Sequence, residues 1–176
     1  MVLRRASLFF LLLVVFSLVW ASQSGQISLS VSPGNPDASG RVAIVEPMAQ
    51  TVTHTQGKAE KITGITIFKI DKIAPGMANR LLIHVILCDP DDMCKVFGNP
   101  HAYINVTVSD SETTPGNVYD WGILSREHAE VMLRPQGVQP STKTLYIQVS
   151  IKVPGGSPPR QQEKQNLNYY CRVELR

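Results

Sequence analysis

Three aspartates in one short segment are the first candidates for chemistry. Asp89, Asp91 and Asp92 lie within the stretch Cys-Asp-Pro-Asp-Asp-Met-Cys. Carboxylate oxygens bind calcium, which takes six to eight oxygen ligands in loose geometry, so a weak calcium site is one interpretation. We favour a solvated turn, because Asp often hydrogen-bonds its own backbone in turns and the EF-hand spacing is absent. No cofactor other than calcium is expected.

The chain contains three cysteines, Cys88, Cys94 and Cys171. An odd number allows at most one intrachain disulfide and leaves one thiol over. We expect a Cys88–Cys94 bridge, because nearness in sequence lowers the entropic cost of closing the loop. Pairing of Cys171 with either of the other two is the alternative. Zinc is not expected, since no C-x₂-C pair is present and no histidine has ligand spacing from these cysteines.

One tripeptide, Asn105-Val106-Thr107, matches the acceptor sequence for N-glycosylation. The match is meaningful if the host glycosylates its exported proteins. Asn105 falls on the polar side of a predicted strand, which is compatible with an attached sugar.

The sequence offers no pattern for catalysis. Its four histidines are scattered, and Arg-Glu-His-Ala-Glu at residues 126–130 lacks the second histidine that a zinc metalloprotease helix requires. The chain has no Gly-x-Ser-x-Gly nucleophile elbow. We therefore expect a protein that is not an enzyme.

The elements that must position these residues read almost entirely as strands. Eight runs are β-branched or alternate between apolar and polar residues, and turn residues separate them. The runs are Gln26–Ser32, Val42–Val45, Ile62–Ile70, Leu81–Cys88, Ala102–Val108, Val131–Leu133, Thr144–Val153 and Leu167–Leu175. This pattern is typical of a sandwich or jelly roll.

Four Pro-Gly pairs mark turns between these runs, Pro75-Gly76 among them. Each pair suits a type II turn, in which proline presets φ and glycine tolerates a positive φ. The one predicted helical turn is Ser125–Glu130, where Ser125 would be the cap.

The first residues predict export. Two arginines, an apolar run of about thirteen residues and small residues near Ala21 form the pattern of a cleaved signal peptide over residues 1–21. An uncleaved anchor is the alternative, but the run is short for a membrane span, which takes about twenty residues. Removing these residues leaves 155 of 176 and lowers the formal charge from +3 to +1, because the two arginines are lost. A nearly neutral chain gives no electrostatic reason to expect nucleic acid or, after cleavage, a membrane as partner.

The N-terminal strand of the mature chain has the most suggestive position. Ile27, Leu29 and Val31 alternate with serines directly after the predicted cleavage site, and a Pro- and Gly-containing hinge follows. Such a strand pairs either within its own sheet or with a neighbouring subunit, where main-chain hydrogen bonds and side-chain pockets bind it. Repeated head to tail, the second arrangement builds an open fibre.

Residues 68–85 carry a family resemblance. The segment Phe-Lys-Ile-Asp-Lys-Ile-Ala-Pro-Gly-Met-Ala-Asn-Arg-Leu-Leu-Ile-His-Val resembles a pattern of the TasA/camelysin family, in which a Pro-Gly turn links two core strands. Ile73, Pro75 and Gly76 match the turn, and Leu81–Leu87 match the following strand. The resemblance covers about half of the mature chain. It implies a secreted jelly roll that assembles into biofilm fibres, as the archaeal bundling pili do by donor-strand complementation.

These observations predict an all-β, jelly-roll-like sandwich of about eight to nine strands. Residues 1–21 are the expected signal peptide, 22–40 the donor strand with its hinge, and 41–176 the sandwich. The expected function is a structural subunit of a secreted filament or pilus, in biofilm or cell–cell contact, whose partners are identical subunits. The alternative is a monomeric, Ig-like module that binds carbohydrate or acts as an adhesin. Its platform would be aromatic: Trp121, Tyr119, Tyr103, Tyr169 and Tyr170.

Overall fold

The computed structural model describes seven segments of the chain. They are residues 24–32, 43–48, 50–55, 59–97, 99–113, 116–155 and 166–176, and for residues 24–32, 50–55, 60 and 166 the backbone alone is described. The predicted signal peptide at residues 1–21 and the predicted hinge at residues 33–40 lie outside these segments. Within them, no helix is both long and apolar enough to cross a membrane.

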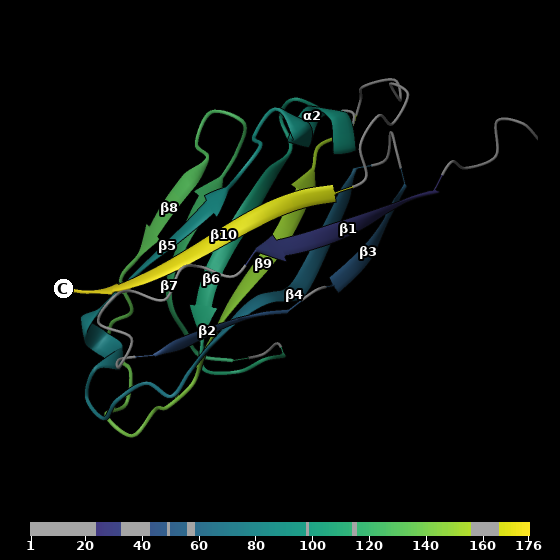
Figure 1. Ribbon diagram of the computed structural model, residues 1–176. Coiled ribbons are helices and arrows are strands. Elements are labelled where there is room, and N and C mark those ends of the chain that lie inside the picture. Colours follow the sequence, from purple (N-terminus) through teal and green to yellow (C-terminus); the bar gives the residue numbers. More distant parts are fainter. Residues whose placement is uncertain are drawn as a thin grey trace, which may run out of the picture.

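The described segments form ten strands and two short helical elements (Figure 1). The strands are β1 (Ser24–Ser32), β2 (Ile44–Pro47), β3 (Gln50–Thr55), β4 (Glu60–Asp71), β5 (Leu81–Leu87), β6 (Tyr103–Ser109), β7 (Val118–Leu124), β8 (Glu130–Leu133), β9 (Leu145–Val153) and β10 (Asn166–Leu175). A 3₁₀ turn, η1 (Ala78–Arg80), precedes β5, and helix α2 (Asp92–Phe97) follows it. Sheet A has the order β3-β1-β10-β5-β8, and sheet B has the order β2-β4-β9-β6-β7.

The core lies between the two sheets and follows the period of two that the sequence predicts. Leu145, Ile147, Val149, Ile151 and Val153 of β9 are all buried. The same alternation buries every second residue of β6, while the residues between them face outward. Because successive side chains of a strand point to opposite faces, one apolar face on each sheet suffices to build this core. The predicted all-β sandwich is confirmed.

Strand β1 has an unusual position in sheet A. It lies between β3 and β10, antiparallel to β3 and parallel to β10. Figure 1 shows β1 and β10 side by side and running in the same direction across one face of the molecule. Among the strand pairs of the described residues, this is the one parallel pair.

The helical prediction was wrong in its location. Residues 125–129 form a bend that leads into β8, and the α-helix lies at Asp92–Phe97, where no helix was predicted. The hydroxyl of Ser125 does accept the predicted capping bond, from the backbone N–H of His128 at 3.1 Å, but the chain extends immediately afterwards. The type II turn prediction is confirmed in its essential feature for Pro75-Gly76, because Gly76 has a φ of +74°, and it is wrong for Pro154-Gly155, whose glycine does not have a positive φ.

Candidate functional site

The backbone of β1 is paired on both sides, so the predicted donor strand sits in a slot of sheet A. Leu29 lies opposite Gln50 of β3 and opposite Leu167 of β10. Val31 lies opposite Tyr169 of β10. Ile27 lies opposite Val52 of β3, beyond the part of β1 that reaches β10. The slot between β3 and β10 is therefore filled by the chain's own N-terminal strand, although the side chains of Ile27, Leu29 and Val31 are outside the description.

Next to this slot, β10 turns alternate side chains into the core. Leu167, Tyr169 and Cys171 are all at most 1% exposed. Burial raises the pKa of the Tyr169 hydroxyl and of the Cys171 thiol, because the charged forms lose their hydration. Within the described part of the chain, the Tyr169 hydroxyl has no hydrogen-bond partner. A buried hydroxyl without a hydrogen-bond partner lowers the stability of the fold. The Tyr169 hydroxyl belongs to β10, the strand that β1 contacts.

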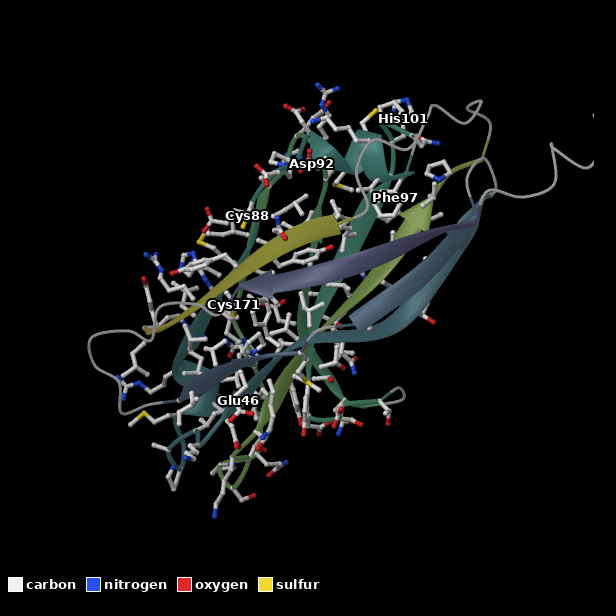
Figure 2. All side chains as sticks on the ribbon, turned by 45° about the vertical axis from the view of Figure 1, so that its right-hand side comes forward. Glu46, Cys88, Asp92, Phe97, His101 and Cys171 are labelled. Atoms are coloured by element: carbon white, nitrogen blue, oxygen red, sulfur yellow. The ribbon has the colours of Figure 1, made fainter. Side chains whose placement is uncertain are left out.

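The predicted calcium ligands lie at one end of the sandwich, in the turn that leads into α2. Figure 2 shows Asp92 there, near Phe97 and His101. Asp91 is exposed and accepts a hydrogen bond of 2.7 Å from Nε of Arg126, whereas Asp92 is buried and pairs with Lys95 at 3.2 Å. The described residues contain no group of three His, Cys, Asp or Glu side chains placed to hold a metal ion. Asp89, Asp91 and Asp92 are thus not gathered into one site, and calcium binding stays a prediction.

The predicted Cys88–Cys94 disulfide is not formed in the structure, where all three cysteines are free thiols. The bridge was expected to close a loop formed by the residues between Cys88 and Cys94. Instead, Cys94 lies within helix α2, whose buried residues Met93, Val96 and Phe97 fix the helix against the core. Partial burial of the Cys88 thiol, and secondarily the charge of Asp89, raises the pKa of that thiol and so disfavours its reactive thiolate form.

The outer face of sheet B carries a two-part hollow, which we call the Tyr103 groove. One part has a volume of about 360 Å³ and is lined mainly by Lys61, Tyr103, Asn105, Ile123, Ser150 and Lys152. The other, of about 350 Å³, adjoins it at Tyr103 and Ile123 and reaches Arg126 and Glu127. Nζ of Lys152 lies over the Tyr103 ring, 5.6 Å from its centroid, within the range of a cation–π contact. The groove thus combines an apolar middle with polar ends.

The aromatic residues proposed as a binding platform do not form one surface. Trp121 is 62% exposed on β7, two residues before Ile123 of the Tyr103 groove. Tyr169 is fully buried, so its inclusion in the platform was wrong. Tyr119 is half-buried, and its hydroxyl donates a 2.7 Å hydrogen bond to Oδ2 of Asp110. Trp121 and Tyr103 remain as aromatic residues available on sheet B.

Four of the six residues named for the first part of the groove were not predicted as site residues: Lys61, Ile123, Ser150 and Lys152. Ile123 lies on β7, a strand that we did not predict. Lys61 and Lys152 are directly opposite each other on β4 and β9, which places two like charges side by side. The outward position of Lys152 follows from the alternation of β9, but its pairing with Lys61 depends on the register of two distant strands.

The models of known protein families and the curated proteins yield no match to this sequence. The resemblance to the TasA/camelysin family therefore stays a prediction.

Proposed function

We propose that the protein is a secreted jelly-roll subunit that polymerises by donating strand β1 to the next subunit. The observation that carries the proposal is the parallel insertion of β1 between β3 and β10. The predicted signal peptide supplies export, and identical subunits are the partners. No catalytic step belongs to this function.

The strand order supports the idea that β1 is an addition to a complete jelly roll. Because β3 is antiparallel to β1 and β1 is parallel to β10, β3 runs antiparallel to β10. Without β1, sheet A would read β3-β10-β5-β8, and sheet B keeps the order β2-β4-β9-β6-β7, so that neighbouring strands run antiparallel throughout both sheets. Eight of these nine strands, four in each sheet, are the make-up of a jelly roll, and the four-residue strand β2 adds a short edge to sheet B. Strand β1 is then the element that enters an otherwise finished fold.

The same pairings are available to a strand from a neighbouring subunit. The slot provides main-chain hydrogen bonds on both sides of the donor, which is the source of affinity in strand addition. The alternating residues Ile27, Leu29 and Val31 would supply side chains to the core, and full burial of such residues is worth about 1.5–3 kcal/mol each. Because the donor strand and the slot are different surfaces of one chain, the contact is head-to-tail and leads to a filament.

Two aspartate substitutions on the same strand test the proposal. Leu29→Asp places a charge on the apolar face of β1, whereas Ser30→Asp places the same charge on its serine face. We expect Ser30→Asp to form filaments and Leu29→Asp to give folded monomers, as judged by electron microscopy and circular dichroism. Filaments from Leu29→Asp as long as those of the wild type would contradict the proposal.

A second candidate function is a monomeric module that binds carbohydrate on the outer face of sheet B. The observation that favours it is the 62% exposure of Trp121 beside the Tyr103 groove, since exposed aromatic rings adjoining a hollow are common in ligand sites. Monomers of the mature chain that bind a soluble oligosaccharide, and lose it on Trp121→Ala, would favour this candidate over the filament.

A further inference from the structure

We propose that Asn105 carries an N-linked glycan whose first sugars lie in the Tyr103 groove. This inference goes beyond polymerisation, because it assigns the outer face of sheet B and not the slot in sheet A. It requires export of the chain but does not depend on the exchange of β1.

The two defining residues of the acceptor sequence, Asn105 and Thr107, face outward together with their aromatic neighbour Tyr103. Tyr103, Asn105 and Thr107 alternate along β6 with Ile104 and Val106, which are fully buried. Asn105 lies opposite Ile123 of β7 on one side and opposite Ser150 of β9 on the other. Among the described residues, no hydrogen bond to the side-chain amide of Asn105 is found, whereas the hydroxyl of Thr107 donates to the backbone carbonyl of Gln148 at 3.5 Å. Asn105 is thus a partly exposed residue that lines the groove and whose amide forms no hydrogen bond within the described part of the chain.

The groove offers a place for the sugars next to their attachment point. Its first part, of about 360 Å³, is bordered by Asn105 itself, and its second part continues past Tyr103. Each volume falls near the lower end of the range of about 300–1,000 Å³ that is typical of small-molecule sites. Tyr103 and Ile123 provide apolar surface for the C–H face of a sugar ring, and Ser150 and the two lysines Lys61 and Lys152 provide polar groups for its hydroxyls.

A glycan here would also cover an exposed edge of the fold. Strand β7 is the last strand of sheet B, and Val118, Trp121 and Ile123 on it are 55%, 62% and 46% exposed. An edge strand with exposed apolar residues is a template for unwanted strand pairing, which natural proteins block by covering the edge. A sugar chain on the adjacent strand β6 covers the exposed edge at β7 and leaves sheet A as the surface for assembly.

The modification is a group transfer that occurs on the chain during export. A bond forms between Nδ2 of Asn105 and the anomeric carbon of an oligosaccharide carried on a lipid phosphate. The bond between that carbon and the phosphate oxygen breaks, the lipid phosphate leaves, and one amide proton goes to a base of the transferase. We place this transfer before the chain folds, so the partial burial of Asn105 in the folded protein is no obstacle.

The first arm of the test is mass spectrometry of the peptide that contains Asn105. It uses the protein secreted by its own source and three variants expressed there: Thr107→Ser, Thr107→Ala and Asn105→Gln. We expect a glycan on the wild type and on Thr107→Ser, which keeps the acceptor sequence, and none on the other two. An unmodified Asn105 in the native protein would overturn the proposal.

The second arm tests whether the sugars lie in the groove. Trp121 is the one tryptophan after residue 21, so fluorescence quenching by acrylamide reports on this face alone. We expect less quenching in the glycosylated wild type than in Thr107→Ala, and a loss of that difference when Tyr103→Ala is added to both. Equal quenching with and without the glycan would overturn the placement. If native Asn105 is unmodified and the groove binds a free oligosaccharide instead, the carbohydrate-binding module replaces this proposal.

Discussion

Replacing Tyr169 by phenylalanine removes one oxygen from the core beside β1 and tests whether that hydroxyl is unpaired. Tyr169 is fully buried, and within the described part of the chain its hydroxyl has no hydrogen-bond partner. The variant keeps the aromatic ring and its packing while removing the polar atom. We therefore expect Tyr169→Phe to stabilise the fold.

The magnitude follows from the cost of burying a hydroxyl without a partner. Mutational data place that cost at about 1–3 kcal/mol, and the small void left by the missing oxygen offsets part of the gain. We expect a net increase of about 1 kcal/mol in the free energy of unfolding. For a domain of this size, that corresponds to a rise in Tm of about 2–4 °C.

Urea unfolding of the mature chain measures the effect, and Tyr119→Phe is the matched control. The Tyr119 hydroxyl donates to the Asp110 carboxylate at 2.7 Å, so the same chemical change removes a bond there and should destabilise by about 0.5–1.5 kcal/mol. Opposite signs for the two variants are the expected result. A loss of stability for Tyr169→Phe equal to that for Tyr119→Phe would refute the reasoning, because it would mean that the Tyr169 hydroxyl has a partner.

Three further predictions concern packing, acid stability and the thiols. A Cβ added at Gly122 would overlap Cγ2 of Val131, so Gly122→Ala should cost about 1–3 kcal/mol in urea unfolding, and adding Val131→Ala should recover part of it; strictly additive effects would show that β7 and β8 do not pack as described. Thr144, which donates to Asp71 at 2.7 Å, and secondarily Lys69, lower the pKa of Asp71 from 3.8 to about 2. The stabilisation of the fold by ionised Asp71 is complete above about pH 4 and is lost as the pH falls towards 2. Thr144→Val should therefore be less stable than the wild type at pH 5 and nearly equal to it at pH 2. A difference in stability that does not depend on pH would contradict the role of Thr144 in lowering the pKa of Asp71. Alkylation without reductant, followed by mass spectrometry, should label all three cysteines after unfolding and leave Cys171 unlabelled in the native protein, whereas a single labelled cysteine would indicate the disulfide.

The parts of the fold that the sequence predicts are those where one face of a strand is buried. On β9, five alternating apolar residues are all in the core, so the period of two was sufficient. On β7 the alternation of apolar and polar residues does not reveal the strand, because Trp121 and Ile123 face outward and Gly122, between them, has no side chain to mark the inner face. Helix α2 has Met93, Val96 and Phe97 at helical spacing, but six residues are too few for the periodicity to stand out against the aspartates before it.

The candidate sites depended on pairings that alternation alone does not specify. The apolar residues Ile27, Leu29 and Val31 predicted a strand, yet nothing in them indicated that β1 would pair in parallel with β10 at the far end of the chain. The groove has the same origin, since Asn105, Ile123 and Ser150 meet only through the register of three strands. Register is set by turns and by the packing of the whole sandwich, so these neighbours require the structure.

The most direct test of strand exchange is negative-stain electron microscopy of two forms of the protein. One is the mature chain beginning at Ser22, and the other begins at Gly34 and so lacks β1. The account predicts filaments from the first and none from the second. Monomers from the mature chain, or filaments from both forms, would contradict the proposal that β1 joins one subunit to the next.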